Sequence, residues 1–225
     1  MDGSGRWARA RGLPRRAGHR AGMEAVRRVV DAAPELGVGV LTLHAFSADN
    51  WQRPAREVAG LMQIFEDYLS ADAELFIERG IRLRVIGRRD RLSAGLREAI
   101  ESAELSTARG TEMLLRLTID YSGREAILRA AARLGKDREA TAENFAELLE
   151  GDEHPGEATP DVDLLIRTGG ELRLSDFHLW ECAYAELYFT PLLWPDFSRP
   201  DLEAALREFA SRDRRFGRIA EKAAT

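Results

Sequence analysis

The sequence has little of what secreted, zinc-binding and membrane-spanning proteins require. Its one cysteine, Cys182, cannot form an internal disulfide, and no cysteine–histidine group has the spacing of a zinc site. No apolar run reaches the ~18 residues that a membrane-spanning helix needs. Acidic residues outnumber basic ones by 38 to 33, for a net charge of −5, whereas a general nucleic-acid-binding protein is usually basic. These absences indicate a cytoplasmic protein that does not bind nucleic acid.

The length and the periodicity predict one α/β domain. A chain of 225 residues with 44% hydrophobic residues can bury a sizeable core. Short apolar segments typical of parallel strands alternate with segments of helical periodicity. The predicted strands are Val38–Ala45, Ile81–Ile86, Met113–Ile119, Val162–Ile166 and Leu187–Phe189. The predicted helices are Val58–Phe76, a segment from Ser93 to near Gly110, Ala126–Leu134, Thr141–Leu149 and Leu202–Ala210, with Gly151–Pro160 as a loop. This order predicts a parallel central sheet flanked by helices.

The start of the chain resembles a loop that should follow a strand. The segment Asp2–Arg6 has the composition of a ligand-binding loop, and parallel α/β sheets place such loops at the carboxyl end of a strand. We therefore expect a first strand upstream of residue 1. Six arginines against one acid in the first twenty residues also match an organellar transit peptide, but the same stretch carries a more specific motif.

That first motif, Asp2-Gly3-Ser4-Gly5-Arg6-Trp7, combines two glycines with an acid and a cation. Glycines let backbone N–H groups approach an anion, and a helix that begins here directs its positive end at the same point. The Asp2 carboxylate is a hard oxygen ligand, and Mg²⁺ commonly binds such a carboxylate together with phosphate oxygens. Arg15 and His19 add positive charge. The alternative is a glycine-rich turn followed by a solvated basic face, and the lysine of a P-loop is missing.

A second motif, Ala45–Pro54, follows directly after a predicted strand, where α/β proteins place their sites. A hydroxyl, a carboxylate, an amide and a cation lie within seven residues, supplied by Ser47, Asp49, Asn50 and Arg53. We expect Phe46 and Trp51 to shield an apolar, cationic intermediate. The alternative is a polar loop with an aromatic plug.

A third motif, Arg167–Ser175, follows the predicted strand Val162–Ile166. Arginine forks match phosphate oxygens, and the turn at Gly169-Gly170 frees backbone donors, so the motif predicts a diphosphate clamp. Glu186 stands in an otherwise apolar segment, where a buried carboxylate needs a partner or a metal. The alternative is a structural network of arginine and glutamate. His44 and His178 are interpreted as packed histidines and not as ligands.

Together the three motifs resemble those of the cis-prenyltransferases, the undecaprenyl diphosphate synthase family. The patterns are Asp-Gly-x-Gly-Arg-Trp, Asn-Trp-x-Arg-Pro and Arg-Thr-Gly-Gly-Glu-x-Arg-x-Ser, and the similarity runs from Asp2 to Gly217. The resemblance implies that isopentenyl diphosphate is joined to an allylic diphosphate with Mg²⁺ as cofactor. It also implies a homodimer with a long hydrophobic tunnel, and it allows a peripheral contact with the inner face of the membrane for product release.

The resemblance further assigns roles to single residues. Asp2 binds Mg²⁺ and helps the allylic diphosphate to leave, Asn50 assists proton loss, and Glu186 is a second contact to the metal. The residues implied to hold the allylic diphosphate are Gly3, Ser4, Gly5, Arg6, Trp7, Arg15 and His19. The substrate-binding loop comprises Ser47, Ala48, Asp49, Trp51 and Arg53. The residues implied to hold isopentenyl diphosphate are Arg167, Arg173, Leu174 and Ser175.

The implied tunnel limits product length, because a growing chain stops when its tail meets a wall. The small side chain of Ala45 favours a medium or long polyprenyl product, and Met113 and Phe76 are expected to form the floor. Four residues depart from the family pattern. Ser4 and Asp120 stand where Asn is usual, Asp49 stands where Glu is usual, and Ser122 stands where Gly is usual. These departures bear on the allylic substrate and the rate more than on the reaction class. Arg116 is also unexpected in a strand of otherwise neutral residues.

Three other functions compete with this interpretation. One is a short-chain cis-prenyl diphosphate synthase, and another is a non-catalytic partner subunit of a heteromeric cis-prenyltransferase. The third is a phosphate-binding regulator or RNA-binding protein that uses the basic N-terminal segment. Because both Asp2 and the Arg167–Ser175 clamp are present, the sequence favours a self-sufficient homodimer.

Overall fold

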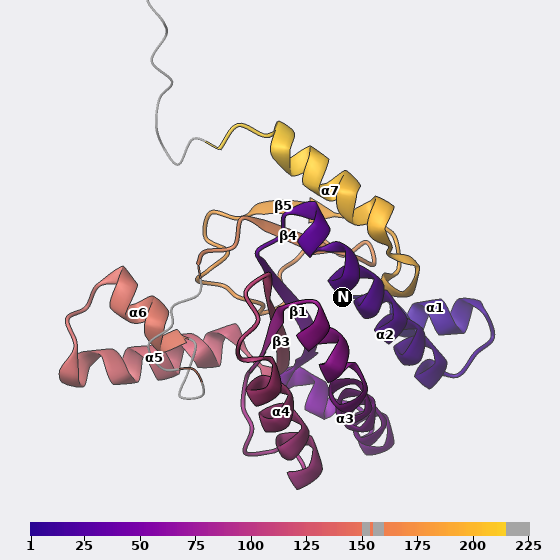
Figure 1. Ribbon diagram of the computed structural model, residues 1–225, viewed down its shortest axis with the longest axis horizontal. Coiled ribbons are helices and arrows are strands. Elements are labelled where there is room, and N and C mark those ends of the chain that lie inside the picture. Colours follow the sequence, from indigo (N-terminus) through magenta and orange to yellow (C-terminus); the bar gives the residue numbers. More distant parts are fainter. Residues whose placement is uncertain (150–153, 155–159, 215–225) are drawn as a thin grey trace, which may run out of the picture.

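The computed structural model describes residues 1–149, 154 and 160–214, and its strands are parallel as predicted (Figure 1). In one sheet, of order β1-β3-β2, the strands are β1 (Val40–Ser47), β2 (Ile81–Ile86) and β3 (Met113–Tyr121). A second sheet pairs β4 (Leu164–Arg167) with β5 (Glu186–Phe189). The α/β class and the parallel pairing are therefore confirmed, although the described strands form two hydrogen-bonded sheets and not one. Most of the predicted loop Gly151–Pro160 lies outside the described residues.

Seven α-helices surround the sheets in the described part of the chain (Figure 1). They are α1 (Ser4–Ala10), α2 (Arg15–Ala32), α3 (Ala55–Glu78), α4 (Ala94–Thr107), α5 (Gly123–Asp137), α6 (Ala142–Leu149) and α7 (Arg199–Ser211). Three short 3₁₀ turns complete them, η1 (Pro34–Leu36), η2 (Ala48–Gln52) and η3 (Trp194–Asp196). The α5–α6 hairpin projects away from the main body, and α7 covers the β4–β5 sheet. None of the described helices combines the length and apolar character needed to cross a bilayer.

Helix α2 was not predicted, and its packing explains why. Its second half buries Val26, Val29 and Val30 at helical spacing, but the buried face of its first half carries Gly18 and Gly22, which interrupt the hydrophobic pattern. A Cβ atom at Gly18 would lie 2.0 Å from the Ser4 carbonyl oxygen, so only glycine allows α1 to approach this closely. Close packing of α1 on α2 fixes the direction in which the first motif enters the molecule.

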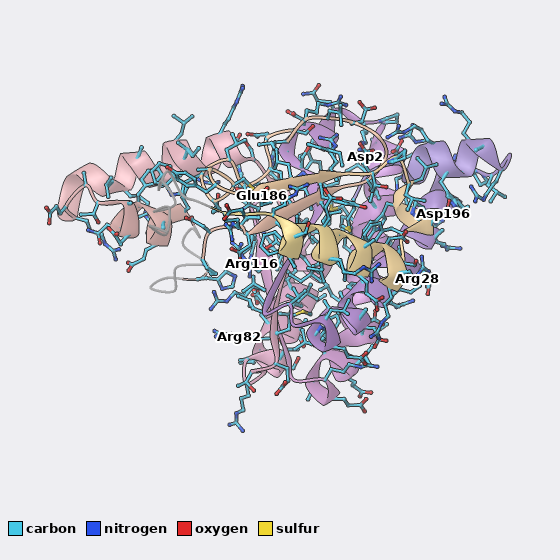
Figure 2. All side chains as sticks on the ribbon, turned by 90° about the horizontal axis from the view of Figure 1, so that it is seen from above. Asp2, Arg28, Arg82, Arg116, Glu186 and Asp196 are labelled. Atoms are coloured by element: carbon cyan, nitrogen blue, oxygen red, sulfur yellow. The ribbon has the colours of Figure 1, made fainter. Side chains whose placement is uncertain are left out.

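The two faces of the larger sheet differ in polarity. One face packs apolar side chains such as Leu43, Leu115 and Leu117 against the helices. The other face carries a row of polar residues in register, Thr42, Arg116 and Arg84. Arg116 is 1% exposed and donates from Nη1 to Thr42 Oγ1 over 3.3 Å. The unexpected arginine therefore belongs to a polar layer on this face (Figure 2).

His44 belongs to the same polar face. Its Nδ1 lies 2.9 Å from Thr118 Oγ1 on β3, and its ring packs at 4.6 Å from that of Phe177. Burial lowers the pKa of His44 from 6.5 to about 3. The unfolded chain therefore binds a proton below pH 6.5 that the folded chain does not bind until about pH 3. The contribution of His44 to the free energy of unfolding is therefore fully present above pH 6.5. It is lost progressively as the pH falls from 6.5 towards about 3.

We expect the wild type to lose stability on acidification faster than His44→Gln, because the variant has no imidazole to titrate. The difference should reach at most about 1.4 kcal/mol per pH unit. Urea unfolding at about pH 7, 6 and 5 measures it, with a linear extrapolation at each pH. Equal slopes against pH for the two proteins would contradict the assignment.

Candidate active site

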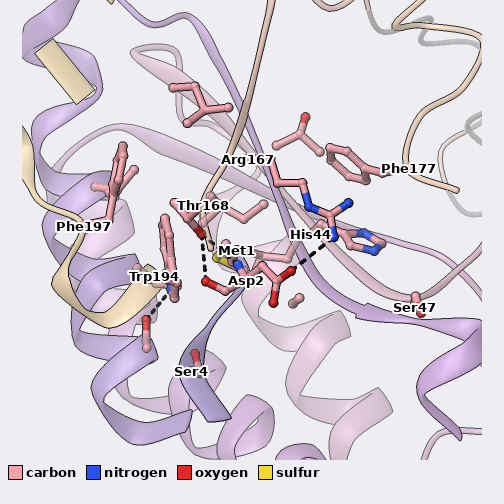
Figure 3. Close-up of a pocket in the computed structure, with 18 of the residues that line it drawn as sticks. Met1, Asp2, Ser4, His44, Ser47, Arg167, Thr168, Phe177, Trp194 and Phe197 are labelled. Carbon is pink, nitrogen blue, oxygen red and sulfur yellow. Dashed lines mark hydrogen bonds and ion pairs between the residues drawn. The ribbon is translucent and has the colours of Figure 1, made fainter. Parts of the chain in front are cut away.

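The first motif is fastened to the turn that follows β4, far away in sequence (Figure 3). The backbone N–H of Asp2 donates to Thr168 Oγ1 over 2.9 Å, and the same hydroxyl donates back to the Asp2 carbonyl over 3.0 Å. The N–H of Trp194 donates to that carbonyl over 2.9 Å. Gly3, with a φ of +107°, lies against Leu193, where a Cβ atom would come within 2.7 Å of a side-chain carbon. The first and third motifs therefore meet, as the diphosphate-site hypothesis requires.

The Asp2 carboxylate lies between two arginines from different segments. Arg167 Nη2 is 3.1 Å from Asp2 Oδ2, and Arg6 Nη2 is 3.4 Å from Asp2 Oδ1. Burial alone raises the pKa of Asp2, but the hydrogen bond from Arg167 and the charges of Arg6 and Arg167 outweigh it and hold the pKa below its ordinary value. Asp2 is therefore a carboxylate at neutral pH.

The loop after β4 forms the predicted clamp around Arg167. Arg167 Nη1 donates to Ser175 Oγ over 2.8 Å and also to the Arg173 carbonyl. The Arg173 side chain is exposed and pairs with Glu171 over 2.6 Å. Arg167, Arg173, Leu174 and Ser175 all line one cavity together with Asp2 and Arg6. The four predicted clamp residues are therefore gathered in one place.

The glycines of this loop have a different role from the one expected. The N–H of Gly169 donates to the Leu192 carbonyl over 2.7 Å, and the N–H of Gly170 donates to the Thr190 carbonyl over 3.0 Å. These donors are used within the protein and are not free for a phosphate. Instead, the φ angles of +88° and +78° require glycine at both positions. Arg6 Nη1 donates to the Gly169 carbonyl over 2.6 Å, which locks the turn onto α1.

The second motif lines the same cavity at the end of β1. Ser47 and Asn50 form a reciprocal cap of η2, in which the Ser47 N–H donates to Asn50 Oδ1 over 3.2 Å. Ser47, Asp49, Asn50 and Arg53 line the cavity. Ala48 and Trp51 are not among the residues that line it, and neither is Phe46, which is fully buried. Trp51 packs against Phe46 at 5.4 Å and under the Arg91 guanidinium, so the expected aromatic shield is wrong.

Glu57, at the start of α3, organises the cations of this region and was not predicted. Its carboxylate oxygen Oε1 lies 3.1 Å from Arg15, 3.4 Å from Arg53 and 3.5 Å from His19. All three partners line the cavity, whereas Glu57 stands behind them. The spacing of Arg53 and Glu57, four residues apart, was the available signal in the sequence.

Two predicted contacts are not brought to the cavity. Trp7 faces the other way: its Nε1 donates to Asp196 Oδ1 over 2.7 Å, and Arg11 stacks on its ring at 4.2 Å. Glu186 is paired in register with Leu164, at the opposite end of β4 from Arg167 and hence about 10 Å along the strand. Its carboxylate accepts from Arg212 over 2.9 Å (Figure 2). Within one chain, Asp2 and Glu186 therefore do not share a metal site.

The cavity measures about 1820 Å³ and changes in character along its length. One part carries the charged residues described above. The rest is walled by apolar side chains of α2, α3, β1 and β3, including Val26, Val29, Leu41, Leu61, Ile64, Phe65, Leu69, Leu117 and Ile119. Met113 and Phe76, expected to form the floor, are buried outside this lining. Tyr68 reaches the wall instead, and its hydroxyl has no hydrogen-bond partner.

Comparisons with known proteins agree with this geometry. The family model described as "Putative undecaprenyl diphosphate synthase" matches residues 1–217. The chain belongs to this family of prenyltransferases. It is 53% identical to isoprenyl transferase 1 of Bradyrhizobium diazoefficiens, over 96% of this chain and 87% of that protein. It is 48% identical to the ditrans,polycis-undecaprenyl-diphosphate synthase ((2E,6E)-farnesyl-diphosphate specific) of Pseudomonas aeruginosa, over 99% and 90%.

Two solved structures share the fold of this prenyltransferase. Lavandulyl diphosphate synthase from Lavandula x intermedia, solved in complex with dimethylallyl diphosphate, superposes with a TM-score of 0.90 and 35% identity, covering 96% of this chain and 95% of that one. A probable undecaprenyl diphosphate synthase from Campylobacter jejuni gives a TM-score of 0.79 and 34% identity over 88% and 93%. The resemblance inferred from the motifs is confirmed at the level of family and fold.

Glu57 provides a test of the cation cluster in this prenyltransferase. Burial lowers the pKa of His19, and the Glu57 carboxylate raises it in part. In Glu57→Gln that opposing charge is gone, so the pKa of His19 should fall further. An NMR titration of the His19 imidazole measures the shift. Asp67→Asn, an exposed change on the same helix, should leave it unchanged, and a His19 pKa that stays constant or rises in Glu57→Gln would contradict the geometry.

Proposed function

We propose that this chain condenses isopentenyl diphosphate with an allylic diphosphate to make a cis-polyprenyl diphosphate. The observation that carries the proposal is one cavity with a charged end, built by Asp2, Arg6 and Arg167, and an apolar remainder. Such a cavity suits a substrate with a diphosphate head and a hydrocarbon tail. Family membership over residues 1–217 supports the same reaction class.

The two halves of the charged end suit two diphosphates. Gly3, Ser4, Gly5 and Arg6 line the cavity at the start of α1, with Arg15 and His19 of α2 beside them. We assign the allylic diphosphate to this half. Arg167, Arg173 and Ser175 form the other half, to which we assign isopentenyl diphosphate. Arg167 is the link, because it contacts both Asp2 and Ser175.

The reaction follows from this arrangement. The allylic C1–O bond breaks, and diphosphate leaves with the electron pair, while Arg6 and Arg15 stabilise the charge that develops on it. The double bond of isopentenyl diphosphate then forms a bond from its terminal carbon to allylic C1. A proton leaves C2, and the new double bond forms in the cis configuration. Asn50 is oriented by its bond from Ser47 and is our candidate for assisting that proton loss.

Mg²⁺ is the proposed cofactor, and Asp2 is the residue that would hold it. Among the described residues, no three histidine, cysteine, aspartate or glutamate side chains gather into a metal-binding group. A Mg²⁺ ion bound mainly by phosphate oxygens needs only one or two carboxylates, which fits a single Asp2 at the charged end. Bound there, the ion would neutralise charge on the departing diphosphate.

The cavity also bears on product length. Sites for small ligands typically measure about 300–1,000 Å³, whereas this cavity measures about 1820 Å³. We therefore favour a medium or long product, with farnesyl diphosphate as the starter by analogy with the Pseudomonas relative. The likeness to lavandulyl diphosphate synthase keeps a short-chain product as the second candidate. A homodimer, which the family resemblance implies, is part of the same proposal.

The proposed function predicts that the purified protein alone consumes isopentenyl diphosphate when Mg²⁺ and farnesyl diphosphate are present. Asp2→Ala should reduce turnover by about 10³-fold, as does losing a key electrostatic stabiliser, and EDTA should abolish the activity of the wild type. Radiolabelled isopentenyl diphosphate measures turnover, and circular dichroism checks folding. Full activity of a folded Asp2→Ala variant, or of the wild type in EDTA, would overturn the assignment of Asp2.

Ala45 provides a test of product length. It lines the cavity at a β-bulge, where the pairing of β1 with β3 shifts between His44 and Phe46. Ala45→Leu adds three carbons to a packed wall, and such overpacking typically costs about 1–3 kcal/mol, enough to exclude a tail. We expect much shorter products at a similar initial rate, measured by chromatography of the dephosphorylated products.

Ala99→Leu is the matched control, since Ala99 packs against the core from α4 outside the cavity lining. It should leave product length unchanged. If the wild type already stops after one or two condensations, Ala45 does not limit the passage.

A further inference from the structure

Backbone strain is concentrated in two loops beside the clamp. In the described part of the chain, the non-glycine residues with positive φ are Asp120, Ser175, Asp176 and His178, with φ between 40° and 63°. Few non-glycine residues adopt this left-handed region, in which asparagine, aspartate and histidine are the more frequent ones. Asp120 lies near the end of β3, shortly before α5, and the other three lie in the loop that carries the clamp. Such strain persists only where surrounding contacts fix the backbone.

Asp176 supplies those contacts between the two loops. Its Oδ2 accepts from the Ser122 hydroxyl over 2.6 Å, and its Oδ1 accepts from the Arg124 N–H over 2.9 Å. Its carbonyl accepts from the Gly123 N–H over 2.9 Å. Ser122 is the N-cap of α5 and also accepts from the Glu125 N–H. Asp176 therefore fastens the clamp loop to the N-terminus of α5.

The residue before Asp176 is Ser175, whose hydroxyl faces Arg167. The turn is thus held at two points: Arg167 binds Ser175 Oγ and the Arg173 carbonyl on one side, and α5 holds Asp176 on the other. Both carboxylate oxygens of Asp176 are occupied by these bonds. Asp176 lines the same cavity, but with its carboxylate engaged in this way the role that we assign to it is to place its neighbours.

A second connection extends from the same region to the second motif. Asp120 is 1% exposed, and its carboxylate accepts from Arg91 Nε over 2.8 Å. The Arg91 guanidinium lies over the Trp51 ring, 5.4 Å from its centroid. Trp51 follows Asn50 directly in sequence. The departures at Asp120 and Ser122 thus fall on residues that connect the clamp, α5 and the Asn50 loop.

We propose that Asp176 is a positioning residue for isopentenyl diphosphate, which holds Arg173 and Ser175 opposite Arg167 before the substrate binds. The proposal rests on the function proposed above. A clamp ordered in advance loses less conformational entropy on binding, so its loss should appear in the affinity for this one substrate.

Asp176→Gly removes the carboxylate while tolerating the positive φ, and is therefore the sharpest variant. We expect the KM for isopentenyl diphosphate to rise about tenfold, which corresponds to about 1.4 kcal/mol, with the allylic KM within about twofold of the wild type. Asp176→Asn accepts from Arg124 and tolerates the left-handed region, so it should recover most of the affinity. Ser122→Gly introduces the residue that is usual in the family pattern. It should raise the KM for isopentenyl diphosphate by less than Asp176→Gly does, again with little change in the allylic KM.

Asp201→Ala is the matched control. Asp201 accepts from the Ser198 hydroxyl over 2.7 Å and from the Ser198 N–H over 2.9 Å at the start of α7, so the variant loses a similar cap at a different helix. It should lower the melting temperature and leave both KM values unchanged. Equal rises of both KM values in Asp176→Gly, or no rise in a folded variant, would overturn the proposal. If Asp176→Gly does not fold, Ser122→Gly decides by the same criterion.

Calorimetric titration with isopentenyl diphosphate separates this proposal from the proposed function. A wild type that neither binds the compound nor turns it over would overturn both. A wild type that binds it, with Asp176→Gly binding equally well, would overturn only the role of Asp176.

Discussion

The candidate active site depends on one hydroxyl group, that of Thr168. It accepts from the Asp2 N–H and donates to the Asp2 carbonyl, and so joins the first residues of the chain to the turn after β4. Thr168 is 1% exposed, so water does not compete for these bonds. The first residues of a chain are poorly ordered unless contacts hold them. Together with the Trp194 N–H on the same carbonyl and the bond from Arg6 to the Gly169 carbonyl, this hydroxyl sets Asp2 opposite Arg167 and joins the two halves of the site.

Much of the fold could be predicted because its strands carry a strong hydrophobic signal. The strand Ile81–Ile86 has the predicted bounds, and β3 extends the predicted Met113–Ile119 by two residues. Helix α2 escaped prediction although Val26, Val29 and Val30 are buried on it at helical spacing, because glycines interrupt its first half. The glycine at position 18 is explained by the close approach of α1. That approach is a tertiary contact, and local periodicity does not contain it. The division of the strands into two sheets likewise depends on pairing partners and not on strand composition.

The motifs located the candidate site but did not give the direction of each side chain. Asp2, Arg167 and Ser175 converge as predicted, since motifs at the carboxyl ends of parallel strands meet at one edge. Trp7 is one turn along from Ser4 but points to Asp196, and Glu186 stands at the wrong end of its strand. Glu57 was missed because its role comes from three partners, two on helix α2 and one in the loop after η2, which no single motif displays.

The cations of the charged end are paired with acids, and under the proposed function this pairing has a catalytic consequence. Arg6 and Arg173 both approach Glu171, while Arg15 and Arg53 approach Glu57. The acids hold like charges together that would otherwise repel, so the arginines keep their positions. A diphosphate must compete with these carboxylates, which weakens its binding in the ground state. Extra charge develops on the diphosphate only as the C–O bond breaks, and the arginines then interact more strongly with it than with the substrate. Binding energy that appears only in the transition state raises the rate.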